Sequence, residues 1–253
     1  MRLLTTLFLT AATLCLVTPA AIAAVRPVRG AELAPATSGQ PADLDDDAGA
    51  EGDEHGACGA QLAGFVEPSG NVARGDAGPV LDPGHLIPPA LLSAALDYYH
   101  QNLARIGNKD VLTVVDFSAS SKAARLFMLD MKDGRVTALH VAHGSGSDPR
   151  ATGFATVFSN TASSNCSSLG FYLTAETYSG KHGYSLRLDG LSATNSNVRE
   201  RAVVIHGADY VHDADVKAGR SWGCLAVSMA ERTAVIDRLK GGSLIFAGLS
   251  KTP

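Results

Sequence analysis

Aromatic residues are scarce in this chain of 253 residues, since Phe, Trp and Tyr together make up only 6% of it. Glycine is generous by comparison, at 26 residues, and the combination favours a β protein rich in turns. Charged residues are also few, at 18% against 45% hydrophobic residues, which is typical of a chain with a globular core. Beyond the first two dozen residues no segment is apolar enough to span a bilayer.

The long apolar run of this sequence stands at its N-terminus. Residues 3–17 are apolar or small, they follow a positive start at Arg2, and they precede the small residues of an Ala21-Ile22-Ala23 sequence. This pattern is typical of a secretory signal peptide over residues 1–23. A membrane anchor is the alternative, but the run is shorter than the ~20 residues that a spanning helix needs. We therefore expect export to the periplasm or cell envelope, with no stable membrane anchor after cleavage.

Residues 24–84 have the composition of a linker. They are rich in Ala, Pro, Gly and Asp, and residues 43–54 alone carry seven acidic side chains. Such a segment cannot bury enough apolar surface to offset the entropy lost on ordering. A calcium loop is the alternative, but the spacing of an EF-hand is absent. We predict a disordered linker followed by a catalytic domain over residues 85–253.

Positive charge is too modest to indicate nucleic-acid binding. The chain as a whole has a formal net charge of −4, whereas the segment from His85 onward carries 17 Lys and Arg against 14 Asp and Glu. A slightly basic domain suits an anionic wall polymer, but a surplus of this size does not argue for nucleic acid as a partner.

Cysteine is rare, with four residues in the chain. Cys15 leaves with the predicted signal peptide, so Cys58, Cys166 and Cys224 remain. An odd number of cysteines in an exported protein indicates one free and reactive thiol. The sequence leaves open whether Cys58 and Cys166 form a disulfide.

Periodicity predicts mostly strands. A helix is expected from Pro89 to Ile106, stopped by Gly107 and Asn108, and a second over residues 229–239. Residues 125–131 and 135–141 flank Asp133-Gly134, a hairpin signal. The remaining expected strands cover residues 111–117, 170–174, 184–188, 202–205 and 244–247. The prediction is a mainly β fold, a sandwich or barrel with a helix before it and short helices at its edge.

Cys224 and His206 are the residues with the strongest chemical signal. Cys224 follows Gly223, and a glycine there lets a substrate carbonyl approach the backbone closely and leaves N–H groups to face an oxyanion. His206 ends an apolar strand, where we expect its side chain at the rim of a sheet. A nearby imidazole can take the proton of a thiol, which is mostly neutral at pH 7. The alternative is an inert core cysteine with an unrelated structural histidine.

The two residues lie within a longer pattern. His206-Gly207, a spacer and Ser221-Trp222-Gly223-Cys224 resemble the signature of YkuD-like L,D-transpeptidases, and a variant subfamily, the murein L,D-transpeptidase catalytic domain proteins, matches further. The resemblance runs in order through five motifs of roughly residues 85–250, at residues 158–160, 167–172, 180–190, 206–211 and 219–224.

This resemblance implies an L,D-transpeptidase fold and a cysteine-dependent acyl transfer on peptidoglycan. Cys224 would attack a tetrapeptide stem to form a thioester, which an amine or water resolves, so L,D-carboxypeptidase activity is a further expectation. His206 would be base and then acid, oriented by the Gly207 carbonyl, with the N–H groups of Gly223 and Cys224 as oxyanion donors. Candidate substrate-binding residues are Ser221, Arg220, Tyr210, His182 and Tyr184. No metal or cofactor is implied.

Two positions depart from the broader family, which often has His at the place of Trp222 and Arg or Asn at that of Ala226. Arg220 is a candidate to replace the lost polar group. A non-catalytic or degenerate wall-binding module is therefore the alternative function. A zinc peptidase using His140, His143 and His206 is disfavoured, because no His-Glu-x-x-His helix exists and residues three apart on a strand face opposite sides.

Overall fold

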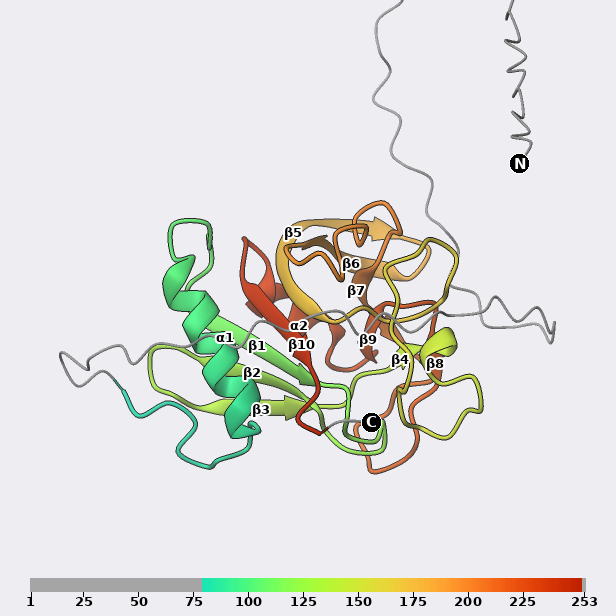
Figure 1. The fold of residues 1–253 in the computed structure, drawn as a ribbon, viewed down its shortest axis with the longest axis horizontal. Helices are drawn as coiled ribbons and strands as arrows, with labels where there is room; N and C mark the ends of the chain where they lie inside the picture. Colours follow the sequence, from blue (N-terminus) through green and yellow to red (C-terminus); the bar gives the residue numbers. More distant parts are fainter. Residues whose placement is uncertain (1–78, 252–253) are drawn as a thin grey trace, which may run out of the picture. The chain divides into compact units, whose positions relative to one another are not determined.

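The structure is a computed structural model that describes residues 79–251 (Figure 1). The predicted signal peptide, most of the predicted linker and Cys58 lie outside these residues. Two helices and a short 3-10 turn accompany ten strands within the described range. Their bounds are α1 Pro89–Gln101, β1 Val111–Asp116, β2 Leu126–Asp130, β3 Val136–Leu139, β4 His143–Gly144, η1 Ser145–Ser147, β5 Gly170–Gly180, β6 Gly183–Gly190, β7 Val204–Ala208, β8 Arg220–Ser221, β9 Leu225–Ser228, α2 Arg232–Leu239 and β10 Leu244–Gly248.

Eight of the strands form one curled, nearly closed sheet, in the order β3-β2-β1-β10-β5-β6-β7-β9. The β1–β10 and β7–β9 neighbours are parallel, and the other neighbours are antiparallel. Strands β4 and β8 pair separately and in parallel. The predicted mainly β fold with few helices is therefore confirmed.

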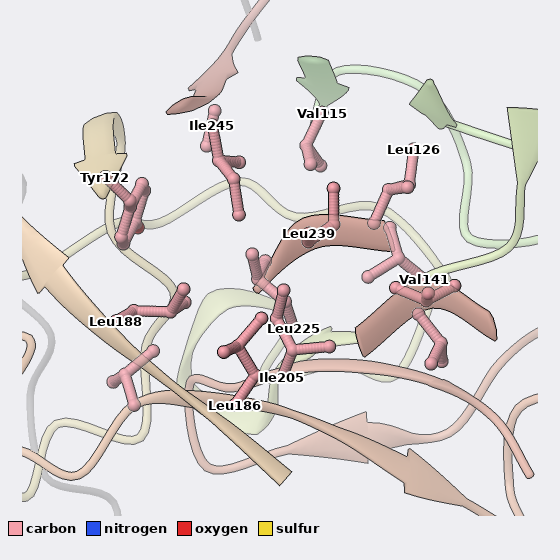
Figure 2. Close-up of a cluster of buried hydrophobic side chains, with 14 of the residues drawn as sticks. Val115, Leu126, Val141, Tyr172, Leu186, Leu188, Ile205, Leu225, Leu239 and Ile245 are labelled. Atoms are coloured by element: carbon pink, nitrogen blue, oxygen red, sulfur yellow. The ribbon is translucent and has the colours of Figure 1, made fainter. Parts of the chain in front are cut away.

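The curled sheet encloses the main hydrophobic core. Apolar side chains from β1, β2, β5, β6, β7, β9 and β10 converge inside it, and α2 fills the interior with Val235, Ile236 and Leu239. Figure 2 shows the labelled members of this cluster pointing toward one another from strands, from α2 and from the segment after β3. Removing this apolar surface from water is the main force that curls the sheet.

A second core lies between α1 and the outer face of β1, β2 and β10. Strands β1 and β10 are thus covered on both faces, which is why they read as continuous apolar runs instead of alternating ones. Leu91, Ala95 and Tyr99 form the buried stripe of α1.

Helix α1 ends five residues earlier than predicted. The backbone N–H and the side-chain amide of Asn102 both donate to the Tyr98 carbonyl, which closes the helix after Gln101. Ile106, whose periodicity suggested a longer helix, is still buried in the second core, but it reaches that core from the loop that follows the helix.

The hairpin predicted at Asp133-Gly134 is confirmed, with β2 and β3 on either side and Gly134 at a φ of 76°. Strand β5 is longer than predicted, and its pairing with β6 shifts between Thr174 and Thr177. Such a bulge bends a strand and increases its twist, and here it helps the sheet to curl. The two-residue strands β4 and β8 and the strand β9 were not predicted.

Part of the predicted linker falls within the described residues. Leu81 packs against the second core, and the carboxylate of the buried Asp82 accepts hydrogen bonds from the N–H groups of Leu86 (2.9 Å) and Ile87 (2.8 Å). Between residues 79 and 251 no helix is long and apolar enough to cross a bilayer.

Candidate active site

His206 occupies the middle of β7, between β6 and β9. It stands opposite Ser185 of β6 and opposite Ala226 of β9. Its side chain is fully buried, so the prediction that it emerges at the rim of the sheet is wrong. The strand continues past His206 through Gly207 to Ala208, because β9 pairs with it that far.

The backbone next to His206 fixes the orientation of its ring. Its Nδ1 lies 3.0 Å from the carbonyl oxygen of Gly207, the contact expected for that glycine. Since a carbonyl only accepts hydrogen bonds, the neutral imidazole keeps its proton on Nδ1 and has its basic lone pair on Nε2. A Cβ on Gly207 would lie 2.8 Å from the side chain of Arg232 and 2.9 Å from that of Met229, so a larger residue would have to push these two side chains aside.

A second imidazole lies against the first. The rings of His182 and His206 have centroids 4.5 Å apart, at an interplanar angle of 31°. His182 comes from the tight connection between β5 and β6, where Gly180 pairs with Gly183. The structure thus brings one of the predicted substrate-binding residues, His182, directly to His206.

Cys224 immediately precedes β9, with a side chain only 3% exposed. Leu225 points into the main core, so alternation directs Cys224 and Ala226 to the opposite face, the one that His206 shares. The Sγ atom lies 3.9 Å from the carbonyl oxygen of Ala202. Ala202 has a φ of 53°, a strained conformation for a residue with a side chain and one that is common at functional sites.

The cysteines have different states. Cys224 carries a thiol that is not part of a disulfide, whereas Cys166 is disulfide-bonded. One free thiol was the expectation from the odd cysteine count.

Hydrogen bonds among its own residues stabilise the turn before Cys224. The Ser221 hydroxyl donates to the Cys224 carbonyl (2.8 Å) and accepts from the Gly223 N–H (3.1 Å). Gly223 has a φ of 119°, and a Cβ there would lie 2.7 Å from the Cys166 carbonyl oxygen, so the position requires glycine. Ser221 therefore shapes the turn, and the oxyanion role predicted for the Gly223 N–H requires its bond to Ser221 to break.

Arg220 and Tyr210 lie around this turn. The Arg220 guanidinium donates to the Asp148 carbonyl (2.7 Å), which anchors β8. Tyr210 packs over Gly219 and against a small apolar cluster that includes the fully buried Ala226. An apolar environment thus surrounds the position where the broader family often has a polar residue.

Tyr184 does not join the other candidates. It lies on the same side of β6 as Leu186 and Leu188, which face the main core, and its hydroxyl donates to Asp237 of α2 (2.9 Å). His206 is opposite Ser185 and hence on the other face of the sheet.

Arg201 is a residue of this region that the sequence analysis missed. Its Nη2 atom lies 3.1 Å from where a Cβ on Gly223 would be, directly beside the turn that carries Cys224. The residues that hold Arg201 here lie far from it in the sequence, so no local motif indicates its position.

A buried polar cluster of Arg125, His143 and Asp148 supports the strand pair that leads to this turn. Arg125 Nη2 lies 2.7 Å from His143 Nδ1, and Arg125 also donates to the Val141 carbonyl through Nε and Nη2. His143 in β4 stands opposite Arg220 in β8. The cluster thereby fixes β4, on which β8 rests.

Electrostatics keep His143 neutral. Its burial, and then the nearby Arg125 charge, lower the pKa of His143 to about 4, in spite of the Asp148 carboxylate 3.5 Å away. Burial opposes ionisation of Asp148, but hydrogen bonds from Thr152 and Gly153 keep its pKa below the usual value. His143 and Asp148 are therefore not an ion pair at neutral pH.

This cluster should make stability sensitive to mild acid. An unfolded histidine binds its proton near pH 6.5, well before folded His143 does, so stability is lost as pH falls from about 6.5 toward 4. The loss is on the order of 3 kcal/mol for this residue. In His143→Gln, thermal unfolding should depend less on pH between 7 and 5 than in the wild type, whereas His140→Gln serves as the control. Equal pH dependence in His143→Gln and wild type would contradict this assignment.

The three histidines considered as zinc ligands each contact a different residue. His140 lies against the Lys122 carbonyl, His143 against Arg125, and His206 against Gly207. Within the described part of the chain, no group of three or more His, Cys, Asp or Glu side chains is arranged to hold a metal ion.

Comparison with known proteins identifies the family. Residues 85–247 match the family described as L,D-transpeptidase catalytic domain. A comparison with curated protein sequences gave no significant match.

Among solved structures, L,D-transpeptidase 1 of Mycobacterium tuberculosis aligns over 54% of this chain and 60% of its own, at 13% identity and a TM-score of 0.32. The L,D-transpeptidase of Xylanimonas cellulosilytica aligns over 62% and 68%, at 16% identity and 0.34. The helical cell shape determining protein of Campylobacter jejuni aligns over 61% and 55%, at 10% and 0.35. The chain thus spans less than two thirds of two of these three structures.

The family match covers the curled β sheet together with the Cys224 thiol and the buried His206. The chain belongs to the L,D-transpeptidase catalytic domain family, a family with a role in peptidoglycan modification. The family inferred from the five sequence motifs is therefore confirmed.

Proposed function

We propose that this protein is an exported L,D-transpeptidase in which Cys224 forms a thioester with peptidoglycan tetrapeptide stems. The observation that carries the proposal is the shared face of β7 and β9. Cys224 precedes Ala226 by two residues there, and Ala226 stands directly opposite His206. Diagonal neighbours on adjacent strands lie roughly 7–8 Å apart at the backbone, a separation that long side chains can bridge, so we propose that the His206 ring exchanges a proton with the Cys224 thiol.

The proposed reaction has two acyl transfers. His206 takes the thiol proton as the Cys224 sulfur bonds to the carbonyl carbon of the diaminopimelate-type residue. The bond from that carbon to the terminal D-Ala nitrogen then breaks, and His206 gives the proton to the leaving amine. An amine of a second stem then bonds to the same carbon and the C–S bond breaks, which yields a cross-link. Water in place of the amine yields a shortened stem, the L,D-carboxypeptidase outcome.

The surroundings of the pair give further residues their proposed roles. The Gly207 carbonyl keeps His206 Nε2 as the basic nitrogen, which is the form a general base needs. Because its ring lies against that of the proposed base, His182 is proposed to contact substrate. Tyr210 is proposed to border the site from the side of Ala226. Export to the periplasm or cell envelope, by the predicted signal peptide, is part of the same proposal.

Digestion of purified cell wall tests the reaction. We expect the protein to convert tetrapeptide muropeptides into cross-linked dimers or tripeptides, measured by chromatography and mass spectrometry of the digest. One free D-Ala should appear for each cross-link or tripeptide formed, because only the donor stem loses its terminal residue. Unchanged muropeptides with retained wall binding would favour a non-catalytic wall-binding module.

A covalent trap tests the nucleophile separately. A carbapenem carries a strained amide carbonyl, so incubation should add one carbapenem mass to the intact protein at Cys224. Peptide mapping locates the adduct. A protein that turns over wall but is never acylated at Cys224 would contradict the proposed thioester.

A further inference from the structure

We propose that Arg201 is a positioning residue for Cys224, and that its guanidinium supplies a fixed positive charge that favours the thiolate. The inference rests on the proposed function, since it assigns the activation of the proposed nucleophile. It adds a group outside the sequence motifs and independent of His206.

Two close approaches place Arg201 beside the cysteine. Its Nη2 atom lies 3.1 Å from the position of a Cβ on Gly223, the residue before Cys224. The carbonyl of the next residue, Ala202, faces the Cys224 sulfur at 3.9 Å. The loop before β7 therefore meets the turn before β9, with Arg201 beside Gly223 and Ala202 beside Cys224.

The guanidinium is held by uncharged groups alone. Nη1 donates to the Ser159 carbonyl (2.8 Å) and the Ser168 hydroxyl (2.7 Å), while Nη2 donates to the Cys166 carbonyl and lies 3.5 Å from the Ser164 hydroxyl. Among the described residues no carboxylate pairs with Arg201. Its charge is thus fixed in place by several hydrogen bonds and is not neutralised by them.

Partial burial strengthens the effect of the Arg201 charge on nearby acidic groups. Arg201 is half-buried, and its burial lowers the pKa of the guanidinium, while Tyr172 and Cys224 are the acidic groups that act in the opposite direction. Tyr172 keeps its proton, because its buried hydroxyl donates to the Ser168 carbonyl and burial raises its pKa. Cys224 is therefore the acidic group at which the Arg201 charge can change the chemistry.

The Arg201 charge counteracts the effect of the Ala202 carbonyl on Cys224. The Ala202 carbonyl facing Cys224 favours the protonated thiol, since a carbonyl accepts a hydrogen bond and repels an anion. The other titratable or charged groups around the turn are His206 on β7, His182 at the β5–β6 connection, Arg220 on β8 and Tyr210. Arg201 differs from the histidines because an arginine stays positive throughout the working pH range.

The rate of Cys224 alkylation as a function of pH tests this inference. Iodoacetamide would be applied to the full-length protein without substrate, and the Cys224 peptide followed by mass spectrometry. Arg201→Gln should move the midpoint of the profile upward by about one pH unit, the effect of removing a nearby opposite charge. Arg201→Lys, which keeps the charge, should stay near the wild type. An unmoved profile in Arg201→Gln, or equal shifts in Gln and Lys variants, would overturn the inference.

A second pair of variants leaves Arg201 in place, in case its replacement prevents folding. Ser164 is half-buried and close to Nη2, so Ser164→Asp brings a carboxylate within reach of the guanidinium, and Ser164→Asn is the uncharged control of equal shape. We expect the Asp variant alone to shift the profile upward, and coinciding profiles would overturn the inference. Because no substrate is present, a negative result leaves the proposed transpeptidase reaction to be judged by muropeptide analysis.

Discussion

Replacing Cys224 with serine is expected to lower muropeptide turnover by at least about 1,000-fold while the fold remains unchanged. The side chain is 3% exposed and the change is nearly isosteric, so the packing around it should be retained. A serine hydroxyl in the same place ionises far less readily than a thiol and would form an ester too slowly to support exchange.

Three measurements separate loss of chemistry from loss of structure. Thermal unfolding should occur within a few degrees of the wild type, wall binding should persist, and the carbapenem adduct should disappear. Turnover at the wild-type rate in Cys224→Ser would refute Cys224 as the nucleophile.

Much of the fold could be predicted from local patterns. The hairpin at Asp133-Gly134 has a strong local signal, since a glycine at positive φ closes it. The end of α1 could not be predicted from periodicity, because Ile106 is buried although it lies outside the helix. The strands β4 and β8 are two residues long and exist through their pairing with each other, which no local pattern encodes.

The candidate site was predictable to a similar extent. Cys224 and His206 stand in recognisable motifs, but the length of β7 depends on its pairing with β9, and so the expected rim position of His206 was wrong. Tyr184 could have been assigned correctly, because a period of two places it with Leu186 and Leu188. Arg201 could not, since its partners Ser159 and Cys166 are 42 and 35 residues away in the sequence.

Replacing His206 with alanine is expected to lower turnover by roughly 100- to 10,000-fold, the usual contribution of a general acid–base. The variant also creates a cavity beside the half-buried His182 ring, so thermal unfolding must be compared first. His206→Gln is the companion variant that leaves a smaller cavity, because glutamine retains much of the side-chain volume but cannot exchange a proton near neutral pH. Both variants should lose turnover alike if proton transfer is the role of His206.

The pH profile of alkylation then distinguishes two forms of the pair. In an ion pair, the imidazolium favours the thiolate, alkylation of Cys224 stays fast well below pH ~8.5, and His206→Ala moves the profile upward toward that of a free thiol. In a neutral pair, His206 acts only during attack, so the variant loses turnover while its alkylation profile hardly moves. The two groups titrate as a coupled unit in the first case.

The Arg201 variants complete the comparison. If the thiolate depends on both charges, the double variant His206→Ala, Arg201→Gln should react with iodoacetamide as an ordinary thiol does, with a midpoint near pH ~8.5. If His206→Ala leaves a low midpoint that Arg201→Gln then abolishes, the guanidinium is the group that activates the thiol and the imidazole serves only proton transfer. A low midpoint that survives the double variant would refute both assignments and direct attention to Arg220, the remaining arginine of the turn.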